Sequence, residues 1–433
     1  MFLISLLLSA IAGLALFANA IPTIEIKGSK FFTSEGDQFF IKGIAYQLVP
    51  DDPLINTTQC NLDASLMKTL GANAIRVYHV DPAGDHDGCM QAFEDAGIYL
   101  FVDLDTFDTQ IEEGAPHWNE SQLNAFTRVM DEFSGYENTA GFFVGNEVLT
   151  TGNGSVAAPY VKAASRDVKA HRDSQSYRKV PVGYSAADIS TLRPMLQNFL
   201  ACGNKSDALD FFALNAYEWC GSDTSFLQSG YSALTTQIKD ILPIPIFFSE
   251  TGCITVRPRT FADQSAIFSD DMSPYWSGAI AYEWIEEANN YGLVSYGEKV
   301  DPSDPEAPPD GYTRSGTPTP ISPDFENLKS QWKTVDPSSV SMNAYSPSVT
   351  AVDCPAMTSG VWNVEQSAAL PSLGQTYDAA ATSASGSGGG QGSATGSAAP
   401  AGTSGAAMPS FKNDLWGMSA GLVGLGFTVL MWL

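Results

Sequence analysis

The chain has 433 residues, 44% of them hydrophobic, and a formal net charge of −26 at pH 7. A surface this acidic repels nucleic acid and anionic lipid, so we expect neither as a partner, while a neutral ligand is not disfavoured. The four histidines are scattered along the chain and no pair of cysteines has metal-ligand spacing. We therefore expect no metal site and no cofactor.

Residues 1–20 predict a secretory signal peptide. They contain no charged side chain, are dominated by Leu, Ile, Ala and Phe, and end at Phe17–Ala20, a small-residue cleavage pattern. A transmembrane helix is the alternative, but the apolar stretch from Phe2 to Phe17 is short for a span. The mature chain is therefore expected to begin at residue 21 and to be exported.

Eight short runs of apolar, β-branched or aromatic residues predict eight strands buried on both faces. The runs are Phe39–Gln47, Ala74–Val80, Ile98–Leu104, Gly141–Val148, Val180–Ser185, Leu209–Tyr217, Ile244–Glu250 and Gly278–Trp284. Amphipathic segments between and after them predict helices over Leu62–Leu70, Cys89–Ala96, Gln122–Glu132, Ala157–Arg172, Thr191–Leu200, Tyr231–Ile241, Phe261–Phe268 and Pro323–Lys333. The Pro- and Asp-rich stretch Asp301–Pro323 predicts a long loop after the last strand.

Strands that alternate with helices predict an α/β fold, here a (β/α)8 TIM barrel formed by residues 21–355. A doubly wound open sheet is the alternative, but the glycine-rich phosphate-binding sequence expected after its first strand is absent. Six cysteines form an even set in an exported chain, which predicts three disulfides. Four sequons predict N-glycosylation at Asn56, Asn119, Asn153 and Asn204.

The end of the chain predicts a stalk and a lipid anchor. Residues 356–410 form a low-complexity linker rich in Ser, Gly and Ala, which we expect to be disordered. Residues 411–433 combine a polar spacer with an uncharged apolar tail, the signal for a glycosylphosphatidylinositol (GPI) anchor after tail removal. A retained membrane helix is the alternative. The candidate attachment residues are Gly402, Ser404 and Gly405, and the expected location is the outer face of the plasma membrane or the cell wall.

Two glutamates mark a candidate active site. Glu147 ends the fourth expected strand and Glu250 ends the seventh, and the carboxyl ends of barrel strands carry the active sites of TIM-barrel enzymes. A single strand-end glutamate is often only a solvated rim residue, but two carboxylates facing each other across the mouth serve as acid/base and nucleophile in glycosidic cleavage. At a separation of about 5–5.5 Å such a pair retains the anomeric configuration.

Aromatic and polar residues at the other strand ends favour a carbohydrate ligand. Tyrosine rings stack on the apolar faces of sugars, and amides and carboxylates bind the hydroxyls. These residues are Tyr46, Gln47, Tyr78, Asp103, Asn215, Tyr217, Tyr282 and Glu283. Each tyrosine alone could equally be a half-buried core residue, so the indication comes from the set. From the residues alone, we infer a retaining glycosidase.

Several sequence runs resemble the fungal β-1,3-glucanosyltransferases of glycoside hydrolase family 72. The runs are Lys42–Gln47, Ile75–Tyr78, Gly145–Glu147, Tyr217–Gly221, Phe247–Cys253 and Val256–Arg259, and the similarity covers about Pro22 to Val335. The resemblance implies a GPI-anchored enzyme that cleaves β-1,3-glucan and transfers the new end to a second glucan chain. It implies Glu147 as the acid/base and Glu250 as the nucleophile.

The resemblance also implies further site residues and the disulfide pairing. The glucan cleft would be lined by Gln47, Tyr78, Asp103, Asn146, Tyr217 and Tyr282. The disulfides would be Cys60–Cys89, Cys202–Cys354 and Cys220–Cys253. Its expected partners are a β-1,3-glucan donor and a β-1,3-glucan acceptor, and the protein is expected to be a monomer.

The chain departs from the family pattern at two points. Thr251 follows the expected nucleophile, where the family usually has an aromatic residue, and only Cys354 follows Cys253, which leaves no room for the cysteine-rich glucan-binding module of some members. Two other functions stay open: a retaining endo-β-1,3-glucanase, and a non-catalytic protein that binds wall glucan.

Overall fold

The computed structural model describes residues 21–50, 52–304 and 307–378. The predicted signal peptide, the linker beyond residue 378, the GPI-signal tail and the candidate attachment residues Gly402, Ser404 and Gly405 lie outside the described residues. Among the described residues, no helix has the length and apolar character needed to cross a membrane.

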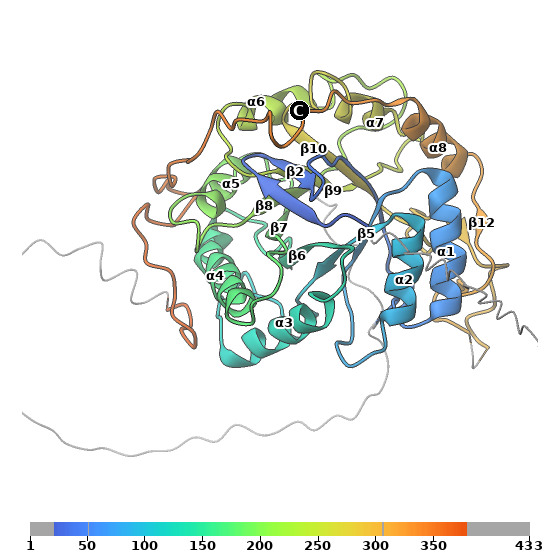
Figure 1. The fold of residues 1–433 in the computed structure, drawn as a ribbon, viewed down its shortest axis with the longest axis horizontal. Helices are drawn as coiled ribbons and strands as arrows, with labels where there is room; N and C mark the ends of the chain where they lie inside the picture. The colour runs from blue at the N-terminus through green and yellow to red at the C-terminus, as the bar shows by residue number, and fades with distance from the viewer. Residues whose placement is uncertain (1–20, 51, 305–306, 379–433) are drawn as a thin grey trace, which may run out of the picture.

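Eight parallel strands form a closed barrel, which confirms the predicted fold (Figure 1). The strands are β3 (Ile41–Ala45), β4 (Ala74–Val77), β5 (Tyr99–Asp103), β6 (Thr139–Asn146), β7 (Val182–Ala187), β8 (Phe211–Asn215), β9 (Ile246–Thr251) and β10 (Trp276–Ala281). Each of them overlaps one of the eight predicted runs. The barrel closes where β10 pairs with β3, and there a Cβ on Gly278 would lie 2.2 Å from the Ile41 carbonyl oxygen. Only glycine permits so close an approach of the two backbones.

Helices surround the barrel in the predicted order. They are α1 (Thr57–Leu70), α2 (Asp87–Ala96), α3 (Glu120–Phe133), α4 (Ala158–Ser174), α5 (Arg193–Ala201), α6 (Tyr231–Ile238), α7 (Ala262–Ile267) and α8 (Asp324–Thr334), with a short 3-10 helix η1 (Asn153–Ala157) before α4. The boundaries follow local chemistry. The Asn119 side chain accepts from the Gln122 N–H at the start of α3, and Gly71 ends α1 in the left-handed conformation.

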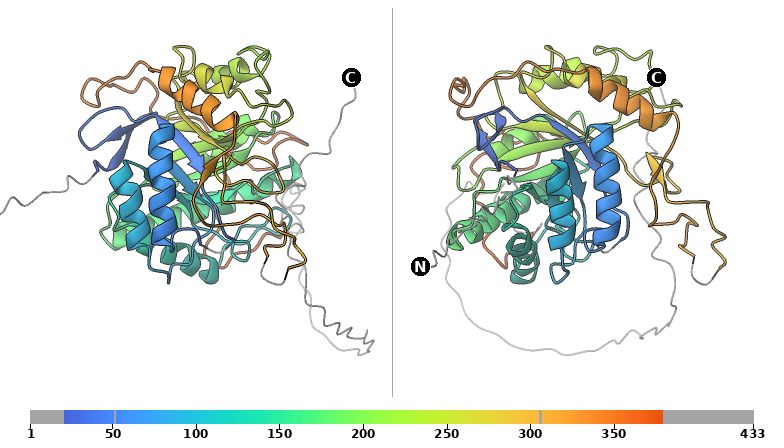
Figure 2. Two further views of the ribbon diagram at one scale, coloured as in Figure 1. Left: turned by 90° about the vertical axis from the view of Figure 1, so that its right-hand side faces the viewer. Right: turned by 45° about the vertical axis from the view of Figure 1, so that its right-hand side comes forward.

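A hairpin that the sequence interpretation did not identify closes the amino-terminal end of the barrel. Strands β1 (Ile24–Lys27) and β2 (Lys30–Thr33) pair antiparallel. Phe31 on β2 is fully buried and contacts Phe101, Phe211 and Phe247 of the barrel interior, with ring centroids 5.8–6.3 Å apart. Figure 2 shows this hairpin at one end of the barrel and the long loop after β10 at the opposite end.

Three disulfides are present, with the pairing that the family resemblance implied. Cys60–Cys89 joins α1 to α2, and Cys220–Cys253 joins the segments that follow β8 and β9. Cys202–Cys354 links the end of α5 to the chain beyond α8. The last two therefore constrain the carboxyl-terminal face and the outer wall of the barrel.

The chain from residue 335 to residue 378, here called the C-terminal strap, runs along the outside of the barrel past α7, α6 and α5 to α4 (Figure 1). Trp362 of the strap is fully buried and packs against Phe199 of α5, with ring centroids 5.3 Å apart. The Pro371 carbonyl accepts from Arg166 of α4. The predicted linker boundary at residue 356 is therefore too early, because residues 356–378 pack against the barrel.

The long connection between β10 and α8 is not entirely a loop. Val294–Ser295 (β11) pairs antiparallel with Thr319–Pro320 (β12), so the predicted loop Asp301–Pro323 contains one strand of a small sheet.

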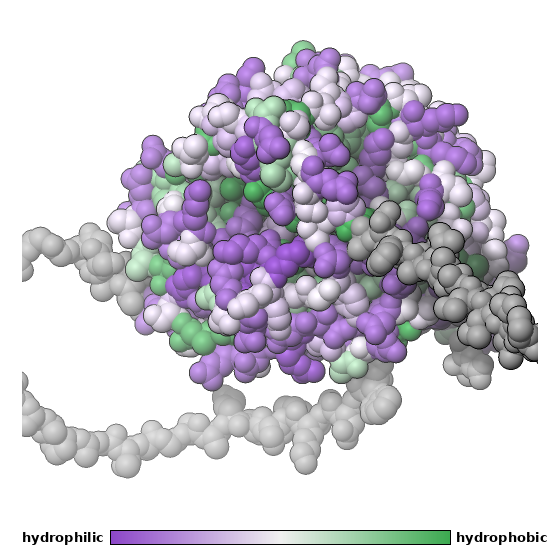
Figure 3. Space-filling view, viewed as in Figure 1, coloured by the Kyte–Doolittle hydropathy of each residue, from purple (hydrophilic) through white to green (hydrophobic). Residues whose placement is uncertain are grey.

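The surface of the barrel agrees with the acidic, polar composition of the chain. On the face seen in Figure 3, hydrophilic residues cover most of the barrel and hydrophobic ones are scattered.

Candidate active site

Glu250 lies in β9 near the carboxyl end of the barrel, and both of its carboxylate oxygens accept hydrogen bonds. The Tyr217 hydroxyl donates to Oε2 at 2.6 Å, and the Tyr78 hydroxyl donates to Oε1 at 3.0 Å. Arg76 Nη1 lies 3.5 Å from Oε1. Two phenols and a cation therefore hold this carboxylate in a single orientation.

Glu147 directly follows β6 and is held by different groups. Its backbone N–H donates to the Ser185 carbonyl of β7 at 2.8 Å, and Asn215 Nδ2 at the end of β8 donates to its Oε1 at 2.8 Å. Its φ of 50° lies in the left-handed region, which costs a non-glycine residue on the order of 1–3 kcal/mol. The residue is exposed, so its carboxyl can reach a bound ligand.

Arg76, inside the barrel, connects the two glutamates. It is fully buried on β4, where Nε and Nη2 form a bidentate pair with Asp103 at 3.0 and 2.7 Å. Nη2 also donates to Asn146 Oδ1, which in turn accepts from Asn215 Nδ2, the group that binds Glu147. Glu250 and Glu147 thus belong to one hydrogen-bond network, although 103 positions separate them in the sequence.

Opposing effects set the protonation of Glu250. Burial is the largest effect, the nearby charge of Glu147 adds to it, and the net result is a pKa raised to about 7. Arg76 and the hydroxyls of Tyr217 and Tyr78 lower the pKa because they stabilise the ionised form. Burial also acts to lower the pKa of Arg76, but Asp103 outweighs it and keeps the guanidinium charged.

Four tyrosines, here called the tyrosine collar, surround Glu250. Tyr78 contacts Tyr282 edge to face with ring centroids 6.5 Å apart, Tyr282 contacts Tyr291 at 5.3 Å, and Tyr291 contacts Tyr217 at 5.7 Å. All four are half-buried, so part of each ring faces solvent. Partly exposed rings beside a reactive carboxylate suit the stacking of sugar rings.

Two of the predicted cleft residues act through their neighbours. Asp103 is only 2% exposed and is bound to Arg76, so its carboxylate positions that arginine and does not face a ligand. The Gln47 amide accepts from the backbone N–H groups of Tyr78 and His79 and donates to the Val49 carbonyl. Gln47 therefore positions the Tyr78 backbone, and its amide is already occupied by main-chain groups.

The sequence interpretation did not select Arg76 or Tyr291 as site residues, and it assigned no specific role to Asn215. Arg76 had a visible signal, since it is the one charged residue within the buried run Ala74–Val77. Asn215 was noted only as a strand-end amide. Tyr291 carried no signal because it lies in a loop and reaches Tyr217 and Tyr282 only in the folded chain.

The departure at Thr251 is accommodated by a polar cluster. Thr251 is buried, and its hydroxyl lies 3.4 Å from Gln264 Nε2 of α7. Gln264 Oε1 accepts from the Trp332 indole of α8 at 2.8 Å. Thr251 is thereby linked through Gln264 to α7 and α8 on the outside of β9.

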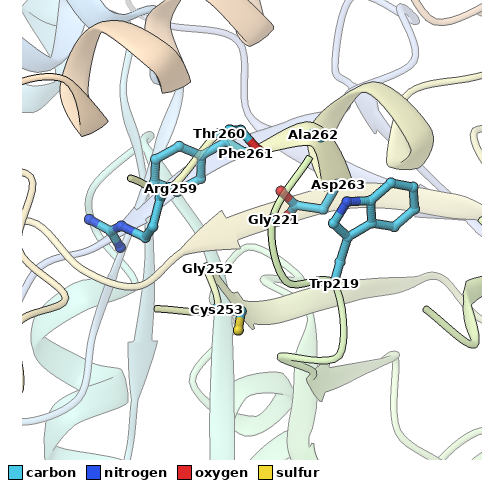
Figure 4. Close-up of a pocket in the computed structure, with 9 residues that line it drawn as sticks. All are labelled: Trp219, Gly221, Gly252, Cys253, Arg259, Thr260, Phe261, Ala262 and Asp263. Atoms are coloured by element: carbon cyan, nitrogen blue, oxygen red, sulfur yellow. The ribbon is translucent and has the colours of Figure 1, made fainter. Parts of the chain in front are cut away.

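A small pocket of about 10 Å³ lies beside the Cys220–Cys253 disulfide (Figure 4). Trp219, Arg259 and Asp263 are among its lining residues. This volume is about that of one water molecule, so the pocket is too small for a sugar ring. In the part of the chain that the structure describes, no group of three or more His, Cys, Asp or Glu residues is arranged to hold a metal ion.

The four predicted glycosylation residues lie outside the hydrogen-bond network that joins Glu147 and Glu250. Asn56, Asn153 and Asn204 are exposed, and Asn119 is half-buried. Asn56 and Asn119 also cap α1 and α3 through their side-chain oxygens. Their modification stays a prediction.

The sequence profile of the glucanosyltransferase family, glycoside hydrolase family 72, matches residues 14–307. The chain belongs to this family. It is 40% identical over 381 residues to the 1,3-beta-glucanosyltransferase gas2 of Schizosaccharomyces pombe, and this alignment covers 84% of this chain and 77% of the relative. It is 42% identical over 363 residues to Protein EPD1 of Candida maltosa, with 82% of this chain covered but only 62% of that relative.

The fold also matches a solved family member. Gas2p of Saccharomyces cerevisiae, a glutamate-to-glutamine variant in complex with laminaritetraose and laminaripentaose, aligns with a TM-score of 0.72 and 38% identity. The alignment covers 82% of this chain and 75% of that chain. The barrel therefore has the fold of a family whose solved member has been captured with these oligosaccharides.

Proposed function

We propose that this protein is a 1,3-β-glucanosyltransferase that elongates cell-wall β-1,3-glucan. The observation that carries the proposal is the network joining Glu147 and Glu250 through Asn215, Asn146 and Arg76 at the carboxyl end of the barrel. Family membership supports both the substrate and the transfer reaction.

In the first step, Glu250 attacks the anomeric carbon of an internal glucose unit. The Tyr78 and Tyr217 hydroxyls and Arg76 favour the ionised carboxylate that this attack needs. Exposed Glu147 protonates the departing glycosidic oxygen, and the fragment carrying the old reducing end leaves. A covalent glycosyl-enzyme stays on Glu250.

In the second step, Glu147 acts as a base. It takes the proton from the 3-hydroxyl at the non-reducing end of a second glucan, whose oxygen attacks the anomeric carbon and releases Glu250. Water at the same position would give hydrolysis instead. An acceptor held in line against the tyrosine collar has the large effective concentration that lets it compete with bulk water.

Replacing either catalytic glutamate tests these assignments. We expect Glu147→Gln and Glu250→Gln to fold normally and to lower turnover at least about 10³-fold, because each step needs both carboxyl groups. Circular dichroism and thermal unfolding check the fold, and product formation from a β-1,3-oligosaccharide checks activity. Normal transfer by either variant would refute the assignment.

Product analysis distinguishes the three candidate functions. A defined β-1,3-oligosaccharide incubated with the wild-type protein is expected to yield both longer and shorter products, resolved by chromatography and mass spectrometry. Only shorter products would identify an endo-glucanase. No change in the substrate, together with measurable binding, would identify a glucan-binding protein.

We also propose that the protein is held on the outer face of the plasma membrane, or in the wall, by a GPI anchor near Gly402, Ser404 or Gly405, and acts as a monomer. The support is the sequence at both ends of the chain, with an apolar leader and a small-residue region, spacer and apolar tail. Mass spectrometry of the mature carboxyl terminus tests the anchor, and a terminus at Leu433 would rule it out.

A further inference from the structure

The loop after β10 contains a buried carboxyl group that the two catalytic steps do not use. Glu283 is 3% exposed, and its backbone N–H donates to the Tyr291 carbonyl at 3.1 Å. Asn289 Nδ2 donates to Glu283 Oε1 at 2.7 Å, and Asn289 Oδ1 accepts from the Tyr291 N–H at 3.0 Å. Glu283 thus holds the backbone of Tyr291 both directly and through Asn289.

Tyr291 transmits this arrangement to the reacting carboxylate. Its ring packs against Tyr282 and Tyr217, and the Tyr217 hydroxyl donates to Glu250. A displacement of Tyr291 would open the tyrosine collar on the side of Tyr217. It would leave in place the Tyr78 and Arg76 contacts to Glu250, which come from β4 and its end.

The charges around Glu283 favour its neutral form. Glu250 on β9 and Glu287 in the same loop both face it, together with the phenols of Tyr282 and Tyr291. Arg259, the cation bound to the Tyr282 carbonyl, is itself paired with Asp324 at 2.7 Å. Burial, followed by the charge of Glu287, raises the pKa of Glu283 well above its ordinary value, while the hydrogen bonds from Asn289 and from the Tyr282 hydroxyl oppose the rise.

We propose that Glu283 is a positioning residue whose neutral carboxylic acid, through Asn289, keeps Tyr291 in the tyrosine collar and so favours attack by an acceptor sugar over attack by water. The inference rests on the proposed function. A buried Glu283 carboxylate facing Glu287 would be destabilised by repulsion and lost hydration, also in the glycosyl-enzyme, where Glu250 is bound to the sugar and uncharged. Opening of the loop after β10 would relieve this destabilisation by exposing Glu283 to water. It would also remove Tyr291 as an acceptor platform, while the glycosyl-enzyme could still be hydrolysed.

The ratio of transfer to hydrolysis, measured against pH, tests the inference. Both reactions start from the same glycosyl-enzyme, in which Glu250 is bound to the sugar and does not ionise. Both also need Glu147 as the base, so ionisation of Glu147 largely cancels in the ratio. For the wild type, we expect the ratio to fall as pH rises through the ionisation of Glu283. Glu283→Gln keeps a neutral acceptor for Asn289 at every pH, so its ratio is expected to lie within about twofold of the wild type at low pH and not to fall.

A second variant breaks the link without altering a charge. Asn289→Ala removes the bridge between Glu283 and Tyr291, and we expect the ratio to drop about tenfold at all pH values through a raised acceptor KM, with hydrolysis retained. Two controls remove the same chemical groups elsewhere. Glu326→Gln, on α8, and Asn61→Ala, on α1, lie on the protein surface and are expected to match the wild type at every pH.

Three results would overturn the inference: a wild-type ratio that does not depend on pH, a Glu283→Gln ratio that falls with pH as the wild type does, or an unchanged ratio in folded Asn289→Ala. If Glu283→Gln does not fold, the wild-type pH profile and Asn289→Ala still decide. Failure of the proposed function gives a different result, because the wild type would then form no longer products at any pH.

Discussion

Individual hydrogen bonds at Glu250 set the balance between the protonated and the ionised form of its carboxyl group. A buried carboxyl tends to keep its proton, and the second glutamate nearby strengthens that tendency. Arg76 and two phenols oppose it, and Asp103 in turn keeps Arg76 fixed and charged. The charge of the proposed nucleophile is therefore controlled by residues from strands that are distant in sequence.

Tyr217→Phe isolates one of these bonds. Loss of the hydroxyl that donates to Glu250 Oε2 removes stabilisation of the ionised form, so the pKa of Glu250 rises. The acid limb of the kcat/KM profile should then move to higher pH by about 1–2 units, since a hydrogen bond to a charged group is worth roughly 1.5–3 kcal/mol.

Tyr345→Phe is the matched control, because Tyr345 bonds to Ser29 at the hairpin end of the barrel. Its acid limb should be that of the wild type. An acid limb that does not move in Tyr217→Phe would show that this hydroxyl does not stabilise the ionised nucleophile.

At the scale of elements, the β1–β2 hairpin gives the barrel a bottom and leaves the reactive end open. Phe31 fills the barrel interior at the end opposite the catalytic network, where it meets Phe101, Phe211 and Phe247. Stability and chemistry are thereby separated along the barrel axis, as in other TIM barrels.

Phe31→Ala should test this separation. Removing a fully buried phenylalanine should lower the free energy of unfolding by about 3–5 kcal/mol through lost burial and a new cavity. Turnover of the folded fraction at low temperature should be within about twofold of the wild type, since no catalytic group contacts Phe31. Denaturant titration and initial rates provide the two measurements.

Phe107→Ala serves as the stability control, because Phe107 is 64% exposed and its loss should change the free energy of unfolding by less than about 0.5 kcal/mol. A Phe31→Ala variant as stable as the wild type would mean that the hairpin does not fill the barrel.

At the scale of the whole molecule, the C-terminal strap joins the barrel wall to the stretch that leads toward the predicted anchor. The Cys202–Cys354 disulfide and buried Trp362 fix its middle, and the Gly374 N–H, which donates to the Trp118 carbonyl, fixes its end. The strap also touches the loop after Glu147, since the Asn363 N–H donates to Ser155 Oγ in η1.

The double variant Cys202→Ser/Cys354→Ser should release the middle of the strap. The disulfide spans 152 residues, and its loss should cost roughly 2–4 kcal/mol of unfolding free energy. Cleavage within residues 340–378 under limited proteolysis should become faster. Met357→Ala, an exposed strap residue, should behave like the wild type, and equal cleavage rates in all three proteins would contradict a role of this disulfide in holding the strap.

The barrel could be predicted from the sequence because its signals are local. Apolar runs of strand length, amphipathic segments between them and turn residues at their ends depend on neighbours along the chain, so all eight strands and the helices around them were identified. The two glutamates were identifiable for the same reason. Each stands at the carboxyl end of a predicted strand, and the carboxyl ends of all strands in a parallel barrel lie on one face.

Other features could be decided only by tertiary structure. The Phe31 plug, the packed strap, the place of Tyr291 in the collar and the Arg76–Asp103 pair each depend on contacts between residues far apart in sequence. Residue types alone do not reveal which buried charges form ion pairs. They also do not reveal which polar side chains are hydrogen-bonded within the protein and so are not free to bind a ligand. By itself the sequence therefore determined the barrel and placed the candidate glutamates at the carboxyl ends of its strands, whereas the three-dimensional packing decided which groups orient and charge these carboxylates.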